Sequence, residues 1–121
     1  MLEIGTIEQL AGNPILGMSW EGFVIENLIA VLPWRSHAFF YRTQVGAEID
    51  LVIEHGDGSL WAIEIKRSLA AGVERGFHIA REDVKPARAF VVYSGDERFP
   101  LGPGVEAIGL VELASELAAM R

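Results

Sequence analysis

Two segments, GAEIDLVIE (46–54) and LWAIEIKRS (60–68), carry acidic residues in the alternating pattern of neighbouring β-strands. Residues two apart in a strand share a face, so Glu64 and Lys66 point the same way. The turn-rich HGDGS between the segments predicts a hairpin, and a hairpin of this length sets Asp50 opposite Glu64. Two carboxylates and one ammonium group are therefore expected in a single patch.

The register follows from centring the hairpin on Asp57. The expected opposed pairs are Glu54 with Leu60, Val52 with Ala62, Asp50 with Glu64, and Glu48 with Lys66. In the first strand the apolar face is expected to hold Ile49, Leu51 and Ile53, and the opposite face Glu48, Asp50, Val52 and Glu54. Slipping by one residue would expose the apolar face, so the register is well specified.

Opposed residues of a hairpin have Cα atoms roughly 4.5–5.5 Å apart, so Asp50 and Glu64 could share one cation. Two facing carboxylates repel, and a divalent cation compensates them. Hard oxygen ligands of this kind suit magnesium or manganese. Lys66 can hold an attacking water and stabilise negative charge that develops on a phosphate. These parts fit metal-assisted phosphodiester hydrolysis.

Asp50 after an isoleucine, followed by Glu64-Ile65-Lys66 at the end of a hydrophobic strand, resembles the PD-(D/E)XK nuclease superfamily. More narrowly, residues 14 to about 95 look like the nuclease-like domain that lies C-terminal to the ATPase module in a family of prokaryotic AAA-type ATPases. The motifs that carry this resemblance are Gly17, Glu21, Phe23-Val24, Tyr41-Arg42, Glu48-Ile49-Asp50 and Glu64-Ile65-Lys66.

The resemblance implies a site for Mg²⁺ or Mn²⁺ in which Asp50 and Glu64 are ligands, Glu21 completes the metal shell and Lys66 positions the nucleophile. The carbonyl of Ile65 is implied as a further ligand. There are departures from the pattern. The leading Pro of the superfamily motif is absent, Arg42 follows Tyr41 directly, and no GxxxxGK[ST] loop for nucleotide binding is present.

The implied fold is an α/β (α+β) restriction-endonuclease-like core, with a mixed sheet of four to five strands flanked by helices in the order α-β-β-β-α-β-β-α. We expect one domain over 1–121, with a leading segment at 1–17 and a core at 18–95. The expected helices are 6–11, 20–33 with Ser19 as N-cap, 70–84 and 112–120, and the expected strands are 37–43, 48–54, 60–66, 88–93 and 105–111. The stretch 95–104 contains several Gly and Pro residues and is expected to be a loop.

Composition sets further bounds. The 121 residues include no cysteine, which excludes a disulfide framework, a thiolate metal site and a cysteine nucleophile. No signal peptide or membrane-length apolar run is apparent, so a soluble, cytoplasmic protein is expected. The net charge of −7 argues against nucleic acid binding, but 34–88 is neutral and the excess lies in its flanks.

Other residues have plainer interpretations. Glu48 is expected to form an ion pair with Lys66 or Arg42, and Glu26 to be solvated. The histidines lack a metal-binding spacing, so His37, His55 and His78 are expected at the surface or in turns. Trp20, Trp34 and Trp61 are expected to be core anchors.

Two functions of different classes remain open. The first is a metal-dependent nuclease, endonuclease or exonuclease, acting on nucleic acid and more specifically DNA. The second is a catalytically silent interaction module that docks to an AAA-type ATPase, to DNA or to a second copy of itself. Convergence of the four side-chain heads in an open cleft would favour the nuclease. A homodimer could form through an exposed edge strand at 105–111.

Overall fold

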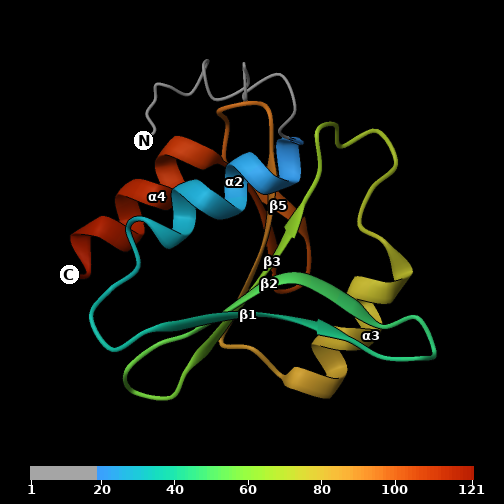
Figure 1. Cartoon of the computed structure of the whole chain (residues 1–121). Coiled ribbons are helices and arrows are strands. Elements are labelled where there is room, and N and C mark those ends of the chain that lie inside the picture. Colours follow the sequence, from blue (N-terminus) through green and yellow to red (C-terminus); the bar gives the residue numbers. More distant parts are fainter. Residues whose placement is uncertain (1–18) are drawn as a thin grey trace.

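A computed structural model describes residues 19–121, and Figure 1 shows their helices arranged around one twisted sheet. The helices are α2 (Trp20–Ile29), α3 (Arg75–Val84) and α4 (Leu110–Ala119). The strands are β1 (His37–Arg42), β2 (Glu48–Glu54), β3 (Leu60–Ile65), β4 (Arg88–Tyr93), β5 (Phe99–Gly102) and β6 (Val105–Gly109). The helix predicted at 6–11 and the whole leading segment predicted at 1–17 lie outside the described residues.

The sheet is mixed and has the strand order β1-β2-β3-β4-β6-β5. β1, β2 and β3 form an antiparallel meander, after which α3 crosses over so that β4 runs parallel to β3. β6 is parallel to β4, and β5 closes the far edge in antiparallel pairing. The predicted mixed α/β architecture with flanking helices is confirmed, with six strands in place of four to five.

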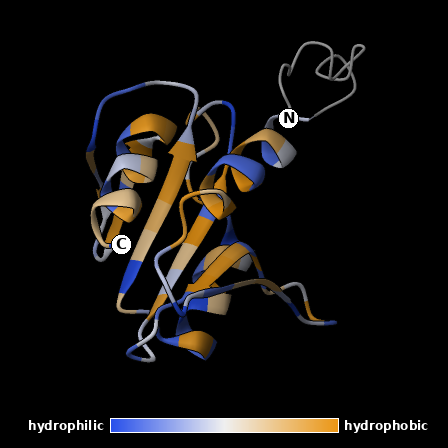
Figure 2. Cartoon of the chain, turned by 60° about the vertical axis from the view of Figure 1, so that its left-hand side comes forward, coloured by the Kyte–Doolittle hydropathy of each residue, from blue (hydrophilic) through white to orange (hydrophobic). Residues whose placement is uncertain are grey.

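Both faces of the sheet are covered, which explains the apolar central strands in Figure 2. On one face α2 and α4 pack side by side against Leu51, Ile63 and Phe90. On the other face α3 packs against Val52 and Ala62. Helix α3 lies close to the turn between β1 and β2 at Gly76, where an added Cβ would collide with the carbonyl of Gly46.

Three predictions about the strands are wrong. The stretch 95–104 is not only a loop, because Phe99–Gly102 forms β5. Consequently β6 lies inside the sheet and is no exposed edge, so the edges available to another copy are β1 and β5. The prediction that Ile49 shares a face with Leu51 is also wrong, since Ile49 packs in the core beneath α3.

The misplaced Ile49 has a clear cause in the pairing of β1 and β2. Phe39 pairs with Val52, but Tyr41 pairs with Ile49, so two steps along β1 match three steps along β2. The extra residue is a β-bulge in β2 at Asp50 and Leu51, and it reverses the alternation of faces beyond it.

No helix among residues 19–121 has the length and apolar character that crossing a membrane requires.

Candidate functional site: a carboxylate pocket between the ends of β2 and β3

The ladder between β2 and β3 stops one pair short of the two predicted metal ligands. Its pairs include Glu54 with Leu60 and Val52 with Ala62, as expected from the hairpin, and the final pair is Leu51 with Ile63. Beyond that pair the backbone N–H of Ile65 donates to Oδ2 of Asp50 at 2.8 Å. A side chain therefore takes the place of a strand carbonyl at the point where the two strands part.

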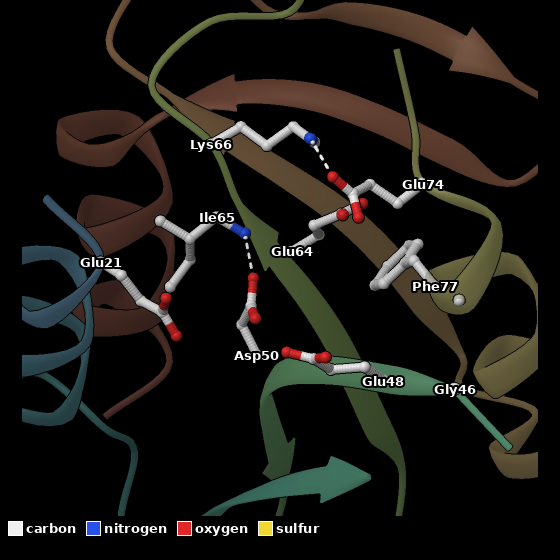
Figure 3. Close-up of a pocket in the computed structure, with 10 residues that line it drawn as sticks. Glu21, Gly46, Glu48, Asp50, Glu64, Ile65, Lys66, Glu74 and Phe77 are labelled. Atoms are coloured by element: carbon white, nitrogen blue, oxygen red, sulfur yellow. Dashed lines mark hydrogen bonds and ion pairs between the residues drawn. The ribbon is translucent and has the colours of Figure 1, made fainter. Parts of the chain in front are cut away.

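Asp50 occupies the bulge, which accounts for its unusual orientation. A bulge inserts one residue and re-aims the neighbouring side chains. In Figure 3 the Asp50 carboxylate points across to the end of β3, between Glu21 on one side and Glu64 on the other. The bulge therefore places the Asp50 carboxylate beside the end of β3. The hairpin pattern in the sequence did not predict this bulge.

Glu64 is buried on the α3 side of the sheet, with only 7% of its surface exposed. Its Oε1 is buried without a hydrogen-bond partner among the described residues. Burial raises the pKa of Glu64 to about 7, opposed by the nearby Lys66 charge and reinforced by Asp50. A buried carboxylate oxygen without a donor is costly, so this atom is a free acceptor for a cation or a proton.

The pKa of Asp50 is also raised, by slightly less than that of Glu64. Burial raises its pKa to about 6, although the hydrogen bond from Ile65 lowers it. The negative charges of Glu21 and Glu48 raise this pKa further, while Arg42 lowers it. Two neighbouring carboxyl groups with raised pKa values are a recognised mark of functional sites, although ion-pair networks in a structural role also shift pKa values.

Lys66 is held by a residue that the sequence analysis missed. Its Nζ donates to Oε2 of Glu74 at 2.8 Å, and this hydrogen bond is the main reason that its pKa is raised. Glu74 is the N-cap residue of α3. The available signal was an acidic residue at the start of the helix that follows the Glu-x-Lys strand. The predicted pairing of Lys66 with Glu48 does not occur, because the ladder has ended before it.

Helix α2 brings the fourth predicted residue, Glu21, to the pocket. Ser19 caps the helix as predicted, its Oγ accepting from the N–H of Gly22 at 2.9 Å. The indole Nε1 of Trp20 donates to the carbonyl of Lys66 at 2.9 Å, which fastens the start of α2 to the end of β3. Glu21 follows directly and lines the pocket opposite the Lys66–Glu74 pair (Figure 3).

The predicted site residues thus line one open pocket of about 280 Å³. Its walls are formed by Glu21, Gly46, Glu48, Asp50, Glu64, Ile65, Lys66, Glu74, Gly76 and Phe77. Within residues 19–121, however, no three acidic or histidine side chains are grouped as a ready-made metal site. The structure therefore brings the four predicted residues into one pocket without drawing Glu21 into a cluster of three ligands.

The donor set fits magnesium in spite of this. Mg²⁺ keeps several waters and is commonly held by only one or two carboxylates together with substrate phosphates. Asp50 and Glu64 are such a pair, and the unpartnered Oε1 of Glu64 is a free ligand atom. The expected roles of Glu21 and of the Ile65 carbonyl as further ligands remain predictions.

Several secondary predictions have clear outcomes. Glu48 pairs with Arg42, at 3.6 Å between Oε2 and Nε, as one of its two expected partners. His55 lies in the hairpin turn but is not at the surface, because it is buried against Trp61. The centres of the two rings are 4.5 Å apart. Trp34 is no core anchor, since it is 78% exposed.

Comparison with known proteins identifies the family to which the chain belongs. Residues 16–113 match the family described as "Domain of unknown function (DUF4143)", and the chain belongs to that family. The uncharacterized protein Rv2008c of Mycobacterium tuberculosis is 42% identical over 99 residues, which are 82% of this chain and 22% of the relative. The uncharacterized protein Mb2031c of Mycobacterium bovis gives the same identity over the same shares. The chain thus spans about a fifth of these relatives. No solved structure matches it significantly.

Proposed function

We propose that this chain is a metal-dependent nuclease domain of the PD-(D/E)XK type, which hydrolyses phosphodiester bonds in nucleic acid, more specifically DNA. The observation that carries the proposal is the buried Oε1 of Glu64, which lacks a partner in a pocket that also holds Asp50 and Lys66. Buried polar atoms in native structures generally have hydrogen-bond partners, so this unpartnered oxygen supports a ligand position at Glu64.

Each residue has a role in the proposed reaction. Asp50 and Glu64 would hold the cation, and the N–H of Ile65 fixes the orientation of the Asp50 carboxylate. When bound, Mg²⁺ would polarise the phosphate and lower the pKa of a water molecule at the site. The Lys66 ammonium would stabilise negative charge on the phosphate, and its hydrogen bond to Glu74 fixes the position of this ammonium.

Raised pKa values also fit a site that is completed by a cation. Burial and mutual repulsion disfavour two charged carboxylates, and a divalent cation reverses both effects. Metal binding should therefore release protons near neutral pH, where Asp50 and Glu64 titrate at about 6 and about 7.

Cleavage of labelled DNA tests this function. The wild type should cut single-stranded, branched or linear substrates in Mg²⁺ or Mn²⁺ and not in a chelator. Glu64→Gln should abolish cleavage, whereas Glu82→Gln, a change of an exposed acid on α3 outside this pocket, should leave it unchanged. Equal cleavage by the wild type and Glu64→Gln would show that the cleavage does not arise from this site.

A second candidate is a silent interaction module that docks to an AAA-type ATPase. It is favoured by the absence of a three-ligand cluster among residues 19–121. It is also favoured by the hydrogen bond that Lys66 already makes to Glu74. Absence of both metal binding and cleavage in the wild type would support this candidate over the nuclease.

A further inference from the structure

The edge strand β1 exposes an aromatic ring beside the carboxylate pocket. Phe40 is 63% exposed, and Cζ of Arg42 lies 5.0 Å from the centre of its ring. The same guanidinium forms the 3.6 Å ion pair with Glu48, which lines the pocket. The ring, the guanidinium and the pocket are therefore connected through direct contacts.

The strand geometry fixes the face on which this ring lies. Ala38 packs against the core beneath α2, and Phe40 is two residues further along the same strand. Residues two apart share a face, so Phe40 lies on the α2 side. Glu21 reaches the pocket from α2 and therefore from the same side.

A second exposed arginine lies next in the chain to Lys66, which lines the pocket. Arg67 follows Lys66 beyond the end of β3, and its Cζ lies 5.9 Å from the ring of Trp20. Arg42 ends β1, Asp50 and Glu64 lie in β2 and β3, and the carbonyl of Arg67 accepts from the N–H of Ser94 just after β4. Two exposed arginines, each over an aromatic ring, therefore neighbour residues that line the pocket, Arg42 through its ion pair with Glu48 and Arg67 through the chain at Lys66.

An exposed phenylalanine next to a guanidinium suits one ligand chemistry in particular. Nucleobases stack on aromatic rings and on arginine planes regardless of their identity, because every base has a π-face. The arginine charge at the same place attracts the phosphate that accompanies the base.

We propose that Phe40 and Arg42 form a stacking platform for an unpaired base of a nucleic acid strand whose backbone passes the carboxylate pocket. This inference rests on the proposed function for its substrate class and adds a preference within that class. In a duplex the faces of each base are covered by its neighbours, so only a single strand or a frayed end can use the platform.

The chain offers a matched control at the other end of the same edge. Arg35 lies over the ring of Trp34 with Cζ 4.4 Å from its centre, and Trp34 is 78% exposed. The backbone of Trp34 lies close to Gly56 in the β2–β3 turn. Six residues of extended strand separate this turn from Asp50, a distance of about 20 Å. This pair has the same chemistry and no access to the pocket.

Fluorescence anisotropy with labelled oligothymidylate and with a blunt duplex tests the platform, using Ca²⁺ in place of Mg²⁺ so that the strand is not cut. Phe40→Ala should weaken single-strand binding about 5- to 100-fold, the loss expected for one base–aromatic stack. Phe40→Trp should bind like the wild type, and Trp34→Ala should change the dissociation constant by less than about twofold. Duplex binding should be weaker and should not depend on Phe40.

Three results would overturn the platform: no strand binding by the wild type, unchanged binding by Phe40→Ala, or an equal loss in Trp34→Ala. Calorimetric titration of the same proteins with Mn²⁺ separates this failure from failure of the nuclease proposal. If metal binding is intact and strand binding does not depend on Phe40, the platform is overturned and the nuclease proposal is not. Strand binding that depends on Phe40 supports the platform even where the metal titration is flat.

Discussion

The carboxylate of Asp50 accepts a 2.8 Å hydrogen bond from the backbone N–H of Ile65, two residues beyond the last pair of the β2–β3 ladder. A strand N–H that would otherwise need a carbonyl partner is satisfied by a side chain. The same bond holds one proposed metal ligand next to the Glu-x-Lys sequence that supplies the other. The end of the hairpin and the centre of the proposed site are therefore one structural feature.

Stability should depend on pH through Asp50 and Glu64. Their pKa values of about 6 and about 7 exceed those of the unfolded chain, so the folded state retains protons that the unfolded state has lost. The contribution of these groups to stability is then fully present below about pH 4 and is lost as the pH rises through about 7. Glu64→Gln should raise the free energy of unfolding at pH 8 by about 1–3 kcal/mol and leave it nearly unchanged at pH 4.

Urea unfolding at the two pH values measures this difference, with Glu82→Gln as the control for loss of an exposed acid. A Glu64→Gln variant that is less stable than the wild type at pH 8 would contradict the claim that the buried charge is unfavourable in the metal-free protein.

Removal of Glu74 should affect Lys66 more than it affects stability. The hydrogen bond from Glu74 is the main cause of the raised Lys66 pKa, so Glu74→Gln should lower that pKa. Because Glu74 is largely exposed, the free energy of unfolding should change by less than about 1 kcal/mol. NMR titration of the Lys66 side chain checks the first expectation, and an unchanged pKa would mean that the ion pair does not persist in solution.

Trp20 should stabilise the junction between α2 and β3. Trp20→Phe keeps an aromatic ring but removes the N–H that donates to the Lys66 carbonyl. The loss should cost about 1–2 kcal/mol, from the hydrogen bond and the carbonyl left without it. Trp34→Phe alters an exposed ring and should be neutral, so equal effects of the two substitutions in thermal unfolding would refute the role of the indole.

The sequence predicted the hairpin well because its signals are local. The HGDGS turn and the alternation on either side determine the pairing of Glu54 with Leu60 and of Val52 with Ala62. β4 was equally clear, since a strand buried on both faces is a continuous apolar run.

The parts that were missed depend on tertiary structure. The bulge at Asp50 arises from pairing with β1, which no pattern within 48–54 reveals. β5 was missed because its sequence, FPLG, resembles a turn and is stabilised by pairing with β6 at the sheet edge. Glu74 reaches Lys66 only because α3 crosses over the sheet, and its position in the chain does not indicate this contact.

The most direct test of the proposed site is calorimetric titration of Mg²⁺ and Mn²⁺ into the wild type, Asp50→Asn and, as a control, Glu82→Gln near pH 7.5. We expect binding with proton release in the wild type and in Glu82→Gln, and loss of that binding in Asp50→Asn. Absence of binding in the wild type at millimolar metal, or undiminished binding in Asp50→Asn, would contradict a metal site at Asp50 and Glu64.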